Sequence, residues 1–234
     1  MPSQTERATT FRTLHQRPGT FIIPNPWDAG TAKLLASLGF EALATTSLGV
    51  ANGLGRANSV VTRAEVIENC RAIVAATSLP VNADLENCFA DAPEAAAVTI
   101  RLAAEAGAVG GSIEDYTGDP ANPIYDFDLA VARVRAAVAV ARSLPVPFLL
   151  TARAENLLHG RNDMGDTIRR LQAYEAAGAD VLYAPGLRNL PEVRQVVAAV
   201  QRPVNVVTGW LDPDITLSQL AEAGVKRVSV GGAL

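Results

Sequence analysis

The chain has 234 residues, of which 49% are hydrophobic and 19% charged, and its formal net charge is −4. This length and composition supply a substantial core, and without a run of Lys or Arg the chain carries no nucleic-acid footprint. Two cysteines, no apolar signal core at the N-terminus and no apolar stretch near about 18 residues predict a cytoplasmic protein without a membrane span, one that binds small molecules or copies of itself.

Short β-rich segments alternate with longer segments of helical period along the whole chain. The helices are predicted to end at a glycine (Gly39, Gly107, Gly178 and Gly224) or at a proline (Pro80, Pro145 and Pro203). One of them, residues 128–143, is predicted as an outer helix with a solvated basic edge. In chain order, the predicted strands are FIIP (21–24), EALATTS (41–47), PVNADLE (80–86), VGGSIED (109–115), PFLLTAR (147–153), DVLYAPG (180–186), VNVVTG (204–209) and RVSVGG (227–232).

Eight strands alternating with helices predict an α/β protein, a (β/α)8 barrel that occupies residues 1–234 as one domain. The absence of a GxGxxG motif after the first strand disfavours an open dinucleotide-binding sheet. The sequence stops at GGAL directly after the eighth strand, so we expect the final barrel helix to be missing from it.

Polar residues recur where the predicted strands end, which is the end at which such barrels hold their chemistry. They are Thr46 and Ser47, Asp84 and Glu86, Glu114 and Asp115, Arg153 and Glu155, Tyr183, and Asn205 and Thr208.

Asp84 and Glu86 are two residues apart, so on an extended strand their side chains point to the same side. Two close carboxylates repel, and a hard divalent cation such as Mg²⁺ resolves the repulsion. Glu114 on the next strand would complete an acidic wall. The alternative is that Asp84 pairs with Arg153 or caps a helix, and the same alternative of a helix cap applies to Asp115.

Arg153 follows the apolar run FLLTA, where a cation requires an anionic partner. That partner is Glu86, Glu114 or a substrate carboxylate, which the planar guanidinium would hold by two hydrogen bonds. His159 lies in the polar loop after the fifth strand and either transfers a proton or is only solvated. His15, in the N-terminal segment, is assigned no chemical role.

Read in order, NPWDAGTAKLL, ATTSLGVANGLG, DLEN, SIED and TARAEN resemble the isocitrate lyase and phosphoenolpyruvate mutase superfamily, most closely its phosphonomutase-like members. The resemblance covers nearly the whole chain. It implies a (β/α)8 barrel enzyme that uses Mg²⁺, with Mn²⁺ as the alternative, and that breaks or makes a C–C or P–C bond in α-keto acids or their enolates. It also implies a homo-oligomer, a dimer or a tetramer.

The same resemblance assigns roles to individual residues. Asp84 matches the principal metal-site aspartate, Glu86 the second acid, and Glu114 the acid that holds metal-bound water. Arg153 matches the arginine that faces the substrate oxygens, so Arg153, Glu114 and Ser47 are the predicted catalytic residues.

Substrate binding is assigned on the same basis. Ser47, with the amides of Leu48 and Gly49, matches the loop that holds a pyruvyl carboxylate, with Thr46 as the alternative one position earlier. Arg153, His159 and Asn205 complete the predicted substrate-binding set.

Two departures from the superfamily pattern limit what the resemblance implies. Asn58 replaces an aspartate near the metal, and the segment YTGDPANPIYDF after Asp115 lacks the Lys and Cys of the lyase loop. We therefore expect a lyase or phosphonomutase-like enzyme acting on a small α-keto or dicarboxylic acid through an enolate, with C–C cleavage favoured. The alternatives are an oxaloacetate hydrolase and a non-catalytic keto-acid binder.

Overall fold

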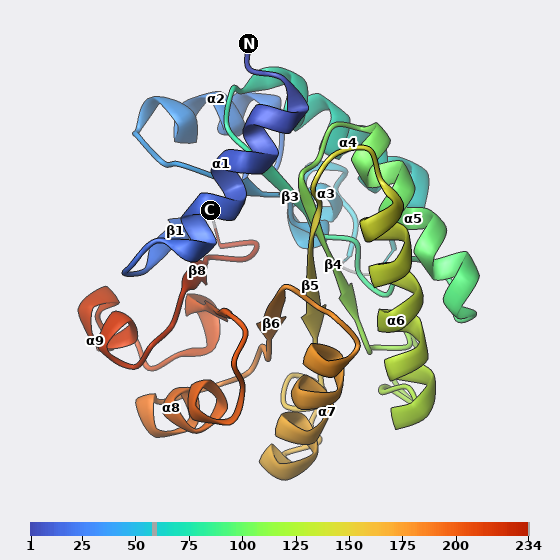
Figure 1. The fold of residues 1–234 in the computed structure, drawn as a ribbon, viewed down its shortest axis with the longest axis vertical. Helices are drawn as coiled ribbons and strands as arrows, with labels where there is room; N and C mark the ends of the chain where they lie inside the picture. The colour runs from blue at the N-terminus through green and yellow to red at the C-terminus, as the bar shows by residue number, and fades with distance from the viewer. Residues whose placement is uncertain (58–59, 234) are drawn as a thin grey trace.

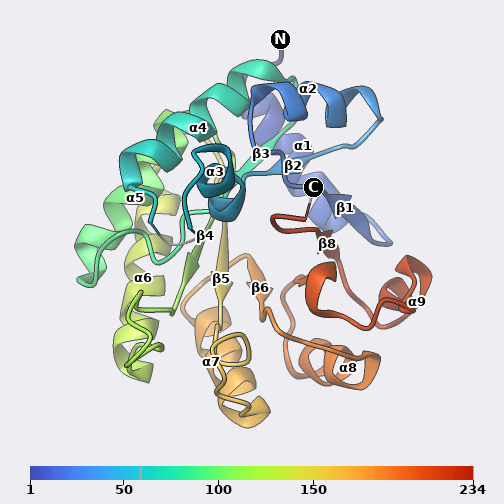
Figure 2. The same cartoon turned by 180° about the vertical axis from the view of Figure 1, so that it is seen from behind.

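The computed structural model describes residues 1–57 and 60–233, and within them eight parallel strands form one sheet in the order β1-β8-β7-β6-β5-β4-β3-β2. Helices surround this sheet (Figures 1 and 2), which confirms the predicted (β/α)8 barrel. The Ala44 amide donates to the Pro24 carbonyl at 3.0 Å, so the first and second strands also touch and the barrel is nearly closed.

The elements follow one another in the alternation that the sequence predicted. They are α1 (Gln4–Gln16), β1 (Phe21–Ile23), α2 (Ala29–Ser37), β2 (Leu43–Ala44), α3 (Ser47–Gly53), α4 (Arg63–Ala76), β3 (Val81–Ala83), α5 (Pro93–Glu105), β4 (Gly110–Glu114), α6 (Phe127–Ser143), β5 (Leu149–Arg153), α7 (Met164–Ala176), β6 (Val181–Tyr183), α8 (Leu190–Ala199), β7 (Val204–Val207), η1 (Thr208–Trp210), α9 (Leu217–Glu222) and β8 (Arg227–Ser229). None of the helices in this part of the chain has the length and apolar character that crossing a bilayer requires.

Except for β5, which ends at Arg153 as predicted, the strands end earlier than predicted. β3 stops at Ala83, and Glu86 has a left-handed φ of 48°, so Asp84 and Glu86 do not share one extended strand as the sequence argument assumed. β2 stops at Ala44 because Thr46 already serves as the N-cap of α3. The residues after these strands therefore form turns and caps that carry side chains over the barrel mouth.

The glycines predicted to end helices have the expected conformation. Gly107, after α5, has φ of 97°, and a Cβ there would lie 2.7 Å from Val74 Cγ1. Gly39, Gly178 and Gly224 likewise have positive φ. Each position lets the chain leave a helix and enter the next strand directly.

The barrel is closed at its N-terminal end by α1. Phe11 and Leu14 of this helix pack against Phe21, Val109 and Leu149 in a cluster separate from the main core between strands and helices. Access to the barrel interior is therefore from the opposite end, where the strands finish.

Helix α6 carries exposed basic residues, Arg135 and Arg142, as predicted, but Arg133 departs from the prediction because it is only 1% exposed. Its guanidinium donates to the carbonyls of Asn87, Ala90 and Asp91 and lies 4.2 Å from the ring centroid of Tyr125. Arg133 thus fixes the segment that directly follows Glu86.

Candidate active site

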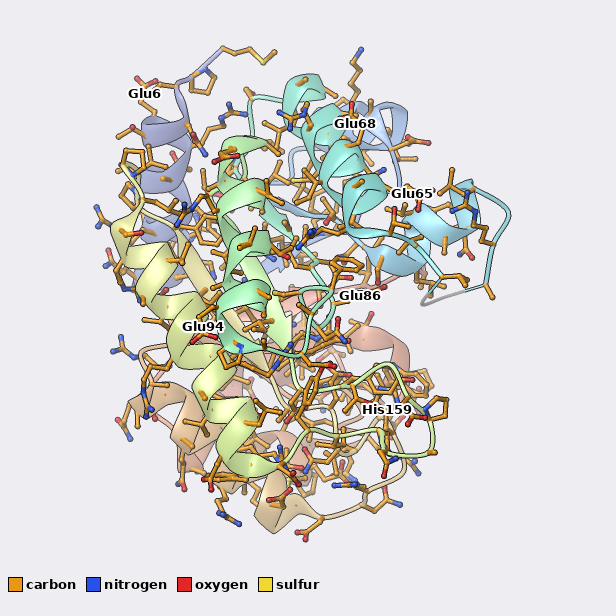
Figure 3. The ribbon with its side chains drawn as sticks, turned by 90° about the vertical axis from the view of Figure 1, so that its right-hand side faces the viewer. Glu6, Glu65, Glu68, Glu86, Glu94 and His159 are labelled. Atoms are coloured by element: carbon orange, nitrogen blue, oxygen red, sulfur yellow. The ribbon has the colours of Figure 1, made fainter. Side chains whose placement is uncertain are left out.

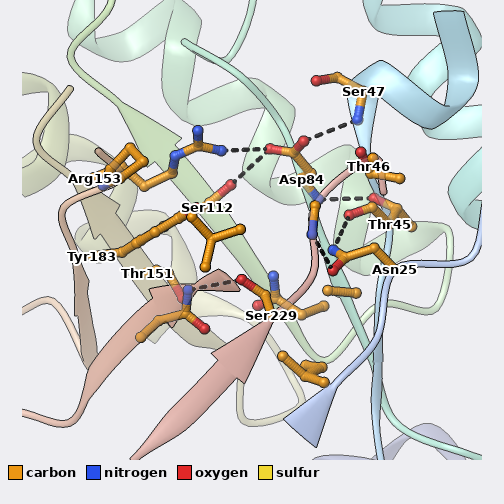
Figure 4. Close-up of a pocket in the computed structure, with 18 of the residues that line it drawn as sticks. Asn25, Thr45, Thr46, Ser47, Asp84, Ser112, Thr151, Arg153, Tyr183 and Ser229 are labelled. Atoms are coloured by element: carbon orange, nitrogen blue, oxygen red, sulfur yellow. Dashed lines mark hydrogen bonds and ion pairs between the residues drawn. The ribbon is translucent and has the colours of Figure 1, made fainter. Parts of the chain in front are cut away.

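A cavity of about 210 Å³ opens at the end of the barrel where the strands finish. Six of the residues predicted for the site line it: Thr46, Ser47, Leu48, Asp84, Arg153 and Asn205. Figure 4 shows Asp84 between Arg153 on one side and Ser47 on the other. The predicted residues Gly49, Glu86, Glu114 and His159 are not among the residues that line it.

Arg153, at the end of β5, pairs with three carboxylates and is 15% exposed. Its Nη1 lies 2.9 Å from Asp84 Oδ1, its Nη2 lies 3.1 Å from Glu114 Oε2, and its Nε lies 2.8 Å from Glu155 Oε1. Glu114 was one of the anions predicted from the sequence to pair with Arg153, and the structure confirms this pair. The pairing of Asp84 with Arg153 was the alternative interpretation of Asp84, and it is also present. Glu155 was not considered as a partner.

These groups leave a local excess of negative charge, since Asp84, Glu114 and Glu155 pair with one guanidinium and Glu86 adds a fourth acid near Asp84. Burial, reinforced by the charge of Asp84, raises the pKa of Glu86 to about 7. Burial also raises the pKa values of Glu114 and Glu155, while Arg153 acts in the opposite direction on both. An additional cation nearby would stabilise the charged form of these buried, mutually repelling carboxylates.

Asp84 is the carboxylate with the most defined position. Its Oδ2 accepts the Ser47 amide at 2.9 Å, and its Oδ1 accepts the Ser112 hydroxyl at 3.4 Å. Its own amide donates to Thr45 Oγ1 at 2.8 Å. Ser47 is the first residue of α3, so the loop that carries it is connected directly to Asp84.

The donor set fits a hard cation that keeps most of its water. Carboxylates and hydroxyls are the oxygen ligands that Mg²⁺ prefers, and it is usually held by one or two carboxylates with several waters. Within residues 1–57 and 60–233, no three His, Cys, Asp or Glu side chains are grouped closely enough to hold an ion directly. Asp84 would therefore be the direct ligand, with Glu86 and Glu114 acting through water.

His159 lies at the outer edge of this cluster. Its ring stacks on Tyr116 with centroids 3.8 Å apart, and its Nε2 lies 3.8 Å from Glu155 Oε2. Burial and then the charge of Arg153 lower its pKa. Figure 3 shows His159 and Glu86 on the same side of the molecule. Asn58, which replaces the expected aspartate, lies outside the described residues.

Asp115 does not line the cavity, and its carboxylate is instead hydrogen-bonded to buried groups of the surrounding elements. Its Oδ1 accepts the Glu155 amide at 2.7 Å, and its Oδ2 accepts the Tyr174 hydroxyl at 2.6 Å and Arg170 Nη1 at 3.1 Å. The interpretation of Asp115 as a helix cap is therefore wrong, because Asp126 occupies the N-cap position of α6.

Several cavity residues were missed by the sequence analysis, among them Asn25, Ser112, Thr151, Arg227 and Ser229. A period of two residues would have found two of them. Ser112 precedes Glu114 and Thr151 precedes Arg153 by two positions, so each shares a face of its strand with a predicted residue at the mouth. Arg227 and Ser229 share a face of β8 in the same way, but neither had been predicted.

Comparison with known proteins gives a consistent set of matches. The model of the phosphoenolpyruvate phosphomutase family matches residues 11–234. A solved structure of a candidate lyase/mutase from Burkholderia cenocepacia J2315 is 60% identical, with a TM-score of 0.96, and the match covers 98% of this chain and 82% of that one. The 2-methylisocitrate lyase of Escherichia coli K12 is 31% identical over 92% of this chain and 75% of its own. An oxaloacetate decarboxylase of Bradyrhizobium diazoefficiens is 28% identical over 85% and 69%, respectively.

Proposed function

The chain belongs to the phosphoenolpyruvate phosphomutase family, and from this membership and the geometry of the site we propose that it is a Mg²⁺-dependent lyase that cleaves a carbon–carbon bond of a small α-keto dicarboxylic acid. Oxaloacetate, for which one of the relatives is named, belongs to this substrate class.

The observation that carries the proposal is the position of Arg153 among acids in the cavity that Ser47 and Asp84 line. Cleaving the bond next to a ketone leaves an enolate, whose oxygen requires positive charge already in place. A bound Mg²⁺ supplies such charge at a developing enolate oxygen. The Asp84, Glu114 and Glu155 carboxylates hold Arg153 in one orientation, and its terminal nitrogens retain N–H groups for the substrate.

Oxaloacetate illustrates the reaction. The bond between the methylene carbon and the distal carboxylate breaks, carbon dioxide leaves, and the electron pair forms the enolate of pyruvate, which then takes a proton at carbon. P–C chemistry is less well supported, since the segment after Asp115 offers no lysine to hold a phosphoryl group.

The test is turnover of oxaloacetate, 2-methylisocitrate and phosphonopyruvate with Mg²⁺, with EDTA as the metal-free control. Because oxaloacetate also decarboxylates in solution, the rate is compared with that of Asp84→Asn protein. We expect pyruvate to form from at least one of the two carbon–carbon substrates far faster with the wild type. Equal rates would contradict the proposal, as would oxalate and acetate as the only products, which would identify a hydrolase.

A further inference from the structure

The same cavity contains a second arginine, Arg227 at the start of β8, whose partners in the structure are all neutral. Its Nε donates to Asn205 Oδ1 at 2.7 Å, and its Nη2 donates to Thr151 Oγ1 at 3.1 Å. Its Nη1 lies 3.4 Å from Nε2 of His15. Arg227 is only 3% exposed, yet it lines the cavity.

His15 is neutral in this position. Its Nδ1 lies 2.8 Å from the Phe11 carbonyl, so Nδ1 carries the hydrogen and Nε2 accepts from Arg227. Burial, with the charge of Arg227, lowers the pKa of His15 to about 3. The histidine therefore provides a hydrogen-bond acceptor and no charge.

Among the residues that the structure describes, no carboxylate balances Arg227. None of the ion pairs formed within residues 1–57 and 60–233 includes this side chain. Burial lowers its pKa to about 10, and the phenol of Tyr183 is the ionisable group that acts against this shift. Arg227 is thus a buried cation at neutral pH, and such a group is costly unless an anion pairs with it.

The count of donors indicates which anion fits. A guanidinium has five N–H groups, and three of those on Arg227 are directed to Asn205, Thr151 and His15. One N–H remains on each terminal nitrogen, and a carboxylate accepts such a pair through its two oxygens.

We propose that Arg227 is the specificity residue of this site and binds the second carboxylate of a dicarboxylic substrate. The inference rests on the proposed function, and it adds that monocarboxylic keto acids are poor ligands. Arg153, already paired with three acids, faces the keto acid end of the substrate, whereas Arg227 receives the distal carboxylate in the deeper part of the cavity.

The test compares ligands that differ in one charge. Dissociation constants of succinate and of its monoamide, succinamate, are measured by titration calorimetry with wild-type, Arg227→Gln and Arg135→Gln proteins, the last being an exposed arginine on α6. We expect wild type and Arg135→Gln to bind succinate at least tenfold more tightly than succinamate. In Arg227→Gln, succinate should weaken to the level of succinamate, whose own affinity should stay unchanged.

Equal binding of the two ligands by wild type would overturn the inference, and this result does not depend on whether Arg227→Gln folds. A folded Arg227→Gln protein that keeps the tenfold preference would overturn it as well. Because these are binding measurements, they are separable from turnover. A preference for succinate without any lyase activity would sink only the proposed reaction, whereas lyase activity without the preference would sink only the role of Arg227.

Discussion

Two neighbouring acids at the end of β4 are expected to respond differently when neutralised. In Asp115→Asn, an amide NH₂ replaces one carboxylate oxygen. In either orientation this NH₂ faces another hydrogen-bond donor, which is the Glu155 backbone amide or the pair formed by the Arg170 guanidinium and the Tyr174 hydroxyl. Removing one member of a buried, hydrogen-bonded ion pair costs about 3–5 kcal/mol. For a domain of this size, 1 kcal/mol corresponds to about 2–4 °C in Tm, so a fall of about 6–20 °C is expected.

Glu114→Gln is the matched control at the adjacent position. Arg153 keeps two carboxylate partners, Asp84 and Glu155, and the neutral amide avoids both the burial of a charge and the repulsion by neighbouring acids that raise the pKa of Glu114. We therefore expect the free energy of unfolding to change by no more than about 1 kcal/mol, while activity is lost. Thermal unfolding followed by circular dichroism at neutral pH measures both variants. The reasoning is refuted if Asp115→Asn unfolds within about 2 °C of the wild type, or if the two variants lose equal stability.

Three further outcomes follow from the structure. Mg²⁺ at a hundredfold excess over its dissociation constant should stabilise the wild type by about 2.7 kcal/mol, and Asp84→Asn should lose most of that gain in thermal unfolding; an unchanged gain would exclude Asp84 as a ligand. Burial lowers the pKa of His15 from 6.5 to about 3, so between these pH values the unfolded chain binds more protons and stability falls as the pH falls. When the free energy of unfolding in urea is plotted against pH over this range, His15→Gln should show a smaller decrease than the wild type, and an identical decrease would contradict this. In Gly110→Ala, the new Cβ would lie 2.9 Å from the Leu149 carbonyl and should cost about 1–3 kcal/mol in urea unfolding, whereas Gly53→Ala, with open space around it, should not destabilise; equal effects would argue against this packing.

The fold was predictable because its signal is repeated. Eight strand segments, seven of them entered through a glycine or proline, predict one topology even if any single segment is misread. The strand ends were less predictable, since Thr46 and Glu86 continue a β-rich pattern in the sequence. Their side chains and backbone instead form a helix cap and a left-handed turn, which depend on the neighbouring elements.

The candidate site was predictable in residue type but not in pairing. Acids after β3 and β4 and an arginine after β5 follow from the sequence, but the choice among Glu86, Glu114 and Glu155 as partners of Arg153 depends on the register of adjacent strands. β4 and β5 place Glu114 directly beside Arg153, whereas Glu86 lies in a left-handed turn and is not among the ion-pair partners of Arg153. Arg133 was predicted to be solvated but is buried, for a related reason. Helical period alone does not reveal that a loop whose carbonyls accept from Arg133 covers this side of α6.

The two arginines of the cavity differ in the charge of their partners, and this difference favours one orientation of a bound substrate. Arg153 has more negative partners than it can neutralise, so its surroundings favour a dication, whereas Arg227 has none in the described part of the chain and favours an anion. A dicarboxylate alone would be repelled from the first region and attracted to the second, and a cation would behave in the opposite way. The proposal therefore implies that the distal carboxylate enters toward Arg227 and that the keto acid end is held where Mg²⁺, Ser47 and Arg153 meet, which places the bond to be broken between the two regions.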